Sequence, residues 1–263
     1  METPPSLPKR PLQWKLAISL ILVLWALMWS IQGTQFNLWV LADALPNVLL
    51  FFQGMLPPWP MDFITRQLIS PLLETIRIAL AASLLGAILA LPIAFMAAKT
   101  VASSIWIYQI TRTLLNLIRT IPDLVLAALL ASAFGIGALP GFLALLIFSF
   151  GVVAKLLSDT IETIDRGPMD AVSTTGATRI LQARHAVFPQ IAPEFIAYTL
   201  YAFEINIRAA TVLGLVGAGG IGMLLKTQIA FLNYTNVGII TAATFIAVLA
   251  IDTVSSVIRK RLI

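Results

Sequence analysis

The sequence predicts an all-α integral membrane protein with about six transmembrane helices. Of the 263 residues, 59% are hydrophobic and only 11% are charged, whereas about 25% of residues are charged in a typical soluble domain. The mean hydropathy of +0.93 points the same way. A soluble protein of this length needs a polar surface that so few polar residues cannot provide. A water-soluble enzyme is therefore close to excluded.

The spacing of the charged residues places the spans. Four long stretches carry no charge, and the turn signal at Gly135–Gly141 divides one of them in two. Another span is less clean because Glu204 and Arg208 lie inside it. A bilayer core needs about 20 apolar residues per helix. The predicted spans are therefore 14–32, 72–98, 106–134, 139–160, 191–215 and 236–258.

The positions of lysine and arginine predict the orientation, because cytoplasmic loops carry more of them. On one side of the predicted membrane the only basic residues are Arg66 and Lys226. Four arginines lie within or at the edges of spans. Both termini are therefore expected in the cytoplasm, and the net charge of +5 reflects topology rather than nucleic-acid binding. The other eleven basic residues fall on the cytoplasmic side: Lys9, Arg10, Lys15, Lys99, Lys155, Arg166, Arg179, Arg184, Arg259, Lys260 and Arg261.

One long polar stretch separates two spans, from about 159 to 190. Pro168 suits the first position of a helix and Gly176 suits the residue after a helix end, so short helices are expected on either side of Gly176. The residues alone leave two interpretations open. The stretch is either a solvated loop without a role or a surface that contacts a partner.

Within this stretch, Asp170-Ala171-Val172 is followed after three residues by Gly176, and after nine more by Ala186-Val187-Phe188-Pro189. This pattern resembles the cytoplasmic EAA loop of binding-protein-dependent ABC importer permeases, which reads Glu-Ala-Ala, three residues, Gly, nine residues, Ile-x-Leu-Pro. The resemblance implies that 166–189 is a cytoplasmic coupling loop that docks into a groove of an ATPase subunit. The implied coupling residues are Asp170, Ala171, Gly176, Ala177 and Pro189.

Three further segments resemble the phosphonate-type ABC permeases. They are Arg119-Thr120-Ile121-Pro122-Asp123, the stretch 151–175, and the run from Tyr201 to Gly222 that contains Phe203-Glu204-Ile205-Asn206-Ile207-Arg208. The resemblance covers about 70–263. It implies a methionine/phosphonate-like ABC permease fold, with one transmembrane permease domain over 1–263.

The resemblance also implies a function. The chain is expected to be a permease subunit, not an enzyme, of an ATP-driven importer for phosphonate or a related phosphorus oxyanion such as phosphite or a phosphate ester. The implied partners are a second permease copy, two ATPase subunits and a periplasmic or extracellular binding protein, in a bacterial cytoplasmic membrane. The chain itself is expected to bind no cofactor, metal or nucleic acid. ATP and Mg belong to the ATPase, since no Walker motif occurs here.

Three alternatives remain: an ABC permease for another small substrate, a multi-span membrane enzyme, and an ion-coupled secondary transporter. A membrane enzyme needs clustered carboxylates, histidines or a metal site. The 12 acidic residues are scattered, the one histidine is His185, and there is no cysteine. The coupling loop argues against a secondary transporter.

A glycine cluster follows the fifth predicted span. It formally fits the dinucleotide fingerprint G-x-G-x-x-G, but a membrane helix precedes it, and the next acidic residue is Asp252. We interpret the glycines instead as a turn that allows close packing and unusual backbone angles, as a pore-lining or gating turn needs. The predicted gating glycines are Gly214, Gly217, Gly219, Gly220 and Gly222.

Charges inside spans are costly and usually functional. Glu204 and Arg208 are four residues apart and flank Asn206, and Arg119 and Asp123 repeat the spacing. One interpretation is that two ion pairs hold the helices in register. The other places these five residues on the substrate pathway, with Arg208 facing the anion.

The orientation makes the first testable prediction. Single cysteines can be introduced into this cysteine-free chain, and Ser173→Cys should be inaccessible from outside intact cells because 159–190 is expected in the cytoplasm. The measurement is labelling with a membrane-impermeant thiol reagent. Labelling of Ser173→Cys from outside would refute the predicted topology.

Overall fold

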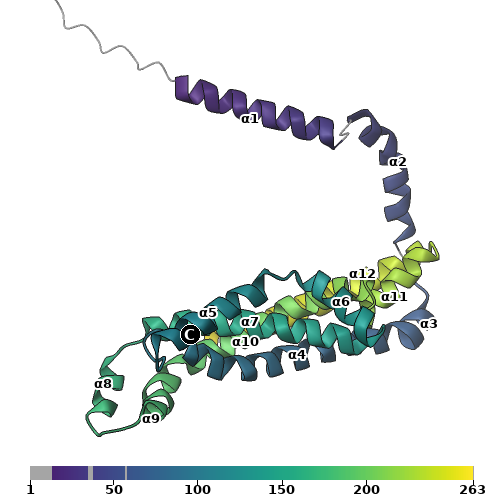
Figure 1. The fold of residues 1–263 in the computed structure, drawn as a ribbon. Coiled ribbons are helices and arrows are strands. Elements are labelled where there is room, and N and C mark those ends of the chain that lie inside the picture. The colour runs from purple at the N-terminus through teal and green to yellow at the C-terminus, as the bar shows by residue number, and fades with distance from the viewer. Residues whose placement is uncertain (1–13, 35–37, 57, 263) are drawn as a thin grey trace, which may run out of the picture. The chain divides into compact units, whose positions relative to one another are not determined.

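The computed structural model describes residues 14–34, 38–56 and 58–262, which form helices joined by turns (Figure 1). The chain divides into two compact units, Met1–Gln53 and Gly54–Ile263. The first unit holds α1 (Trp14–Gly33) and most of α2 (Leu38–Gly54). No residue in the apolar window of α1 is buried, so this helix presents apolar side chains all round, as a lipid-facing span does. That 1–263 acts as one domain stays a prediction.

The second unit holds the other helices. It begins with the short helix α3 (Met61–Phe63) and the π-helical η1 (Ile64–Leu68), which continue into α4 (Ile69–Met96). The sequence continues with α5 (Ile105–Thr120), α6 (Asp123–Phe134), α7 (Ala138–Thr163), α8 (Gly167–Ser173), α9 (Arg179–Gln182), η2 (Ala183–Val187), α10 (Phe188–Leu215), α11 (Gly220–Ala230) and α12 (Tyr234–Leu262).

Within the described residues, five helices are long and apolar enough to cross a membrane, or six if one bent pair counts as a span. The fold class is therefore confirmed: the protein is an all-α membrane protein. Figure 1 shows α8 and α9 at one end of the second unit and α11 toward the other end.

The third predicted span, 106–134, differs from a continuous helix. It is divided into α5 and α6, which are bent by 82° at the break. Ile121 is extended (φ −79°, ψ 120°) because a residue before proline is driven out of the helical region. Pro122 is extended too and has no N–H to continue the helical bonding. The Asp123 carboxylate then accepts the Leu124 N–H at 3.0 Å, at the start of α6.

The core of the second unit lies where α4, α7 and α10 meet, and it is built from small residues. Ala79, Ala82 and Ala90 of α4 are fully buried, as is Ala144 of α7. A Cβ on Gly86 would lie 2.8 Å from the Cβ of Ser149. Small residues let helix backbones approach closely, which is how helices associate in lipid.

Candidate functional site

The segment predicted to couple to an ATPase lies on the surface of the second unit. Helix α8 begins with Pro168 in its first turn and has no buried residue. Asp170 and Ala171 are exposed within it, and Pro189 is exposed at the start of α10. Ala177 is half-buried. The short helices expected around Gly176 are present as α8 and α9.

Gly176 takes the conformation that a helix end requires. Its φ is +78°, and apart from its neighbours in the chain no atom of the described residues lies within 4 Å of the position a Cβ would take. The residue is exposed. Glycine is needed here for its backbone angle and not for close approach.

Side chains fix both ends of the coupling segment to the bundle. Gly167 N–H donates to the Asp165 carboxylate at 3.0 Å, and Gln190 donates to the Asp165 carbonyl at 3.2 Å. Arg179 donates to the carbonyl of Ala102, in the loop between α4 and α5, at 2.8 Å. The segment is therefore held to Asp165, just after the end of α7, to α10 and to that loop.

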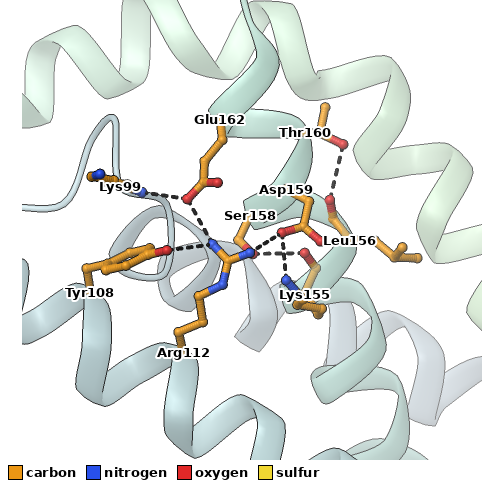
Figure 2. Close-up of polar contacts among 9 residues, drawn as sticks. All are labelled: Lys99, Tyr108, Arg112, Lys155, Leu156, Ser158, Asp159, Thr160 and Glu162. Atoms are coloured by element: carbon orange, nitrogen blue, oxygen red, sulfur yellow. Dashed lines mark hydrogen bonds and ion pairs between the residues drawn. The ribbon is translucent and has the colours of Figure 1, made fainter.

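A charge network joins α5 to the end of α7 next to this segment (Figure 2). The Arg112 guanidinium donates to Asp159 at 2.7 Å and to Glu162 at 2.9 Å. Lys155 donates to the same Asp159 oxygen at 2.7 Å, and the Tyr108 hydroxyl accepts from Arg112 at 3.1 Å. Two cations therefore neutralise two carboxylates, through charge-assisted hydrogen bonds.

The same network reaches the loop between α4 and α5. The backbone N–H of Lys99 donates to Glu162 at 2.9 Å, and Thr100 donates to the carbonyl of Ile161 at 3.2 Å. Sequence reasoning did not single out this network. Its local signals were the four-residue spacings of Lys155 with Asp159 and of Tyr108 with Arg112. The acidic partners of Arg112 are 47 and 50 residues away, beyond the reach of local reasoning.

The break between α5 and α6 opens a cavity of about 450 Å³. Arg119 and Asp123, both predicted pathway residues, line it together with Phe148 of α7 and Tyr201 of α10. Arg119 is exposed and forms neither an ion pair nor a hydrogen bond within the described residues. The structure therefore brings Arg119 and Asp123 to one cavity without pairing them.

Asn206 lies elsewhere, in the core. It is fully buried, and its amide donates to Ser83 of α4 at 2.7 Å and to Ser149 of α7 at 2.6 Å. Its Oδ1 has no hydrogen-bond partner among the residues that the structure describes. Asn206 thus links three packed helices through a buried polar contact, away from the cavity.

Glu204 and Arg208 lie on a third side of the bundle, toward α12. Glu204 is only 7% exposed and forms its ion pair with Arg259 of α12, not with Arg208. Arg208 is exposed, and its Nε donates to the backbone carbonyl of Glu204 at 3.2 Å. The crevice that Arg208 shares with Asp252 leaves no room for a water molecule. The five predicted pathway residues are therefore divided among three places.

The predicted gating glycines form a buried crossing between α10 and α11. A Cβ on Gly214 would lie 2.6 Å from the Cα of Gly222, so the two backbones nearly touch. Gly219 and Gly220 have positive φ, and the N–H of Ile221 donates to Thr75 of α4 at 2.8 Å. Gly217 is buried as well, and its carbonyl accepts from Gly137 at 2.9 Å. The close packing is present; a gating role stays a prediction.

Comparison with protein families identifies a matching model. The model described as "Binding-protein-dependent transport system inner membrane component" matches residues 90–263. This range includes the coupling segment, the cavity and the glycine crossing.

Several curated relatives are similar in sequence. A phosphite transport system permease protein from Stutzerimonas stutzeri is 36% identical over 84% of this chain and 79% of its own. A phosphate-import permease protein from Mycolicibacterium smegmatis is 37% identical over 83% of this chain, which spans 41% of that longer protein. A putative cryptic phosphonate transport system permease protein from Escherichia coli is 40% identical over 46% of this chain and 99% of its own.

Solved structures share the fold. A chain of a methionine ABC transporter in an inward-facing conformation matches with a TM-score of 0.66 and 19% identity, over 76% of this chain and 98% of its own. A chain of an amino acid ABC transporter matches with a TM-score of 0.63 and 24% identity, over 76% of this chain and 96% of its own. The predicted methionine/phosphonate-like fold is therefore confirmed.

The charge network makes a prediction about stability. Arg112→Met should lower the free energy of unfolding by about 1–2 kcal/mol, because it removes the cation shared by Asp159 and Glu162. Arg112→Lys should lower the free energy of unfolding by a smaller amount, since lysine keeps the positive charge but lacks the guanidinium that bonds both carboxylates. Chemical denaturation of the detergent-purified protein measures both changes.

The matched control is Arg66→Met, since Arg66 is exposed and forms no ion pair within the described residues. Its stability should stay within about 0.5 kcal/mol of the unmodified protein. Equal decreases in the free energy of unfolding of Arg112→Met and Arg66→Met would show that the network does not stabilise the fold.

Proposed function

Because the chain belongs to the family of binding-protein-dependent transport system inner membrane components, we propose that it forms the pathway of an ATP-driven importer for phosphonate or a related phosphorus oxyanion. One observation supports this substrate class: relatives at 34–40% identity are named for phosphite, phosphate and phosphonate transport. Relatives named for choline or carnitine transport match at 26–28% identity. A permease for another small substrate is therefore the second candidate.

The proposed complex contains two copies of this chain, two ATPase subunits and a periplasmic or extracellular binding protein. The ATPase binds ATP and Mg, and this chain binds neither. Both termini and the coupling segment lie in the cytoplasm of a bacterium, where the exposed helix α8 reaches the ATPase. The support for this arrangement is the exposure of Asp170, Ala171 and Gly176.

The proposed mechanism is alternating access. ATP binding closes the ATPase pair, the coupling segments move with it, and the membrane helices reopen toward the other side. Arg119 and Asp123 lie on the pathway at the helix break, and Arg208 is exposed on α10, on a different side of the bundle. Glu204 and Asn206 support α10 through their contacts with α12, α4 and α7.

The test of the substrate class is transport by the reconstituted complex. The permease, its ATPase and its binding protein are placed in liposomes, and uptake of labelled phosphite is measured with and without ATP. Accumulation should require ATP, and excess methylphosphonate should compete while choline does not. Accumulation of labelled choline, with no uptake of either phosphorus oxyanion, would replace this proposal by the second candidate.

The coupling segment makes a prediction at Gly176. Gly176→Val should reduce copurification of the ATPase, or uncouple ATP hydrolysis from uptake, because a β-branched residue is strained at a φ of +78°. Gly176→Asn is the matched control, since asparagine tolerates the left-handed region and there is open space around this position. Both variants should insert normally in the membrane. Full coupling in Gly176→Val would contradict the docking assignment.

A further inference from the structure

The cavity at the break between α5 and α6 has the composition of a binding site for an organic anion. Its walls are mostly apolar and include Ile147 and Phe148 of α7 and Ile205 of α10. The residues with polar side chains that line it are few: Arg119, Asp123 and Tyr201. Small-molecule sites typically have a volume of about 300–1,000 Å³, with apolar walls and a few polar groups that fix orientation.

The cavity lies near the middle of the spans. Phe148 lies well inside α7, which runs from Ala138 to Thr163, and Tyr201 is close to the centre of α10, which runs from Phe188 to Leu215. An unpaired charge at this depth is expensive, so an anion that reaches it gains strongly from a cation. Sites in transporters often form at broken helices near the midplane.

Arg119 is available to a ligand. Its guanidinium forms no hydrogen bond or ion pair within the described part of the chain, although Asp123 is only four residues away. Gly151 of α7 makes room for its stem, because a Cβ on Gly151 would lie 3.1 Å from the Cγ of Arg119. A guanidinium can bind two oxygens of one oxyanion.

Asp123 opposes tight binding. Its carboxylate accepts the Leu124 N–H at 3.0 Å and so already occupies the positive end of α6. A bound oxyanion next to it meets a like charge, which lowers its affinity. A translocation pathway needs this balance, because a ligand must be able to enter and also to leave.

We propose that this cavity is a transient oxyanion site inside the permease. Arg119 binds the anionic oxygens, the Tyr201 hydroxyl donates a further hydrogen bond, and the apolar wall contacts the organic substituent. Asp123 keeps the affinity low enough for release. The site rests on the proposed function, and it differs from the crevice at Arg208, which has no room even for water.

The experiment measures protection of a cysteine by the substrate. Ile205→Cys is introduced into the cysteine-free chain, and the complex with its ATPase and binding protein is reconstituted in liposomes. Methylphosphonate should slow modification of this cysteine by a small thiol reagent during ATP turnover. Val212→Cys, exposed on α10 four residues after Arg208 and outside the cavity, is the matched control and should not be protected. If Ile205→Cys does not assemble, Ile147→Cys reports on the same wall.

Variants of Arg119 test the ligand contact. Arg119→Gln should raise the methylphosphonate concentration for half-maximal protection at least about tenfold, equal to about 1.4 kcal/mol. Gly151→Ala keeps the charge but displaces the stem of Arg119, and should raise the same concentration by a smaller factor. It serves as the second test if Arg119→Gln folds poorly.

The outcomes separate this site from the proposed function. ATP-dependent uptake of phosphite or methylphosphonate without protection at Ile205→Cys would overturn the site and leave the proposed function standing. Protection at Val212→Cys alone would place the anion at Arg208 instead. Absence of uptake for both oxyanions would overturn the proposed function and the site with it.

Discussion

The close packing of α4, α7 and α10 is the interaction on which the other features depend. In lipid there is no water to drive helices together, so contacts between small residues and buried hydrogen bonds must do so. Gly86 and the alanines of α4 provide the close approach, and Asn206 bonds Ser83 and Ser149 at the point where the three helices meet. The cavity, the pair of Glu204 with Arg259, and the coupling segment are each attached to this three-helix core.

The sequence predicted the parts of this structure that local chemistry decides. Charge-free stretches marked the spans. Pro168 and Gly176 marked the ends of the surface helices, because proline fixes its own φ and glycine can adopt the positive φ that a helix end requires. The break at Pro122 was not predicted, and proline alone would not have indicated it. Pro92 and Pro193 lie inside α4 and α10, which remain helical. Packing therefore decides which proline ends a helix.

The partners of the intramembrane charges were also beyond local reasoning. A four-residue spacing indicates that two side chains share a helix face, but it does not exclude a partner from another helix. Glu204 is paired with Arg259, 55 residues away, and Arg119 and Asp123 lie on either side of a bend that removes the helical spacing between them. The five predicted pathway residues are polar residues within the spans, but tertiary contacts decide which of them lie together.

Helix α7 connects the proposed coupling surface to the cavity. Its C-terminal end carries Asp159 and Glu162, which bond Arg112 of α5, and its middle carries Phe148, which lines the cavity. Arg112 and Arg119 belong to the same helix α5 and are two turns apart. A helix transmits displacement along its length, since its backbone hydrogen bonds resist bending. Movement of the segment beyond Thr163 would therefore act on both walls of the cavity at once, through α7 directly and through Arg112 on α5.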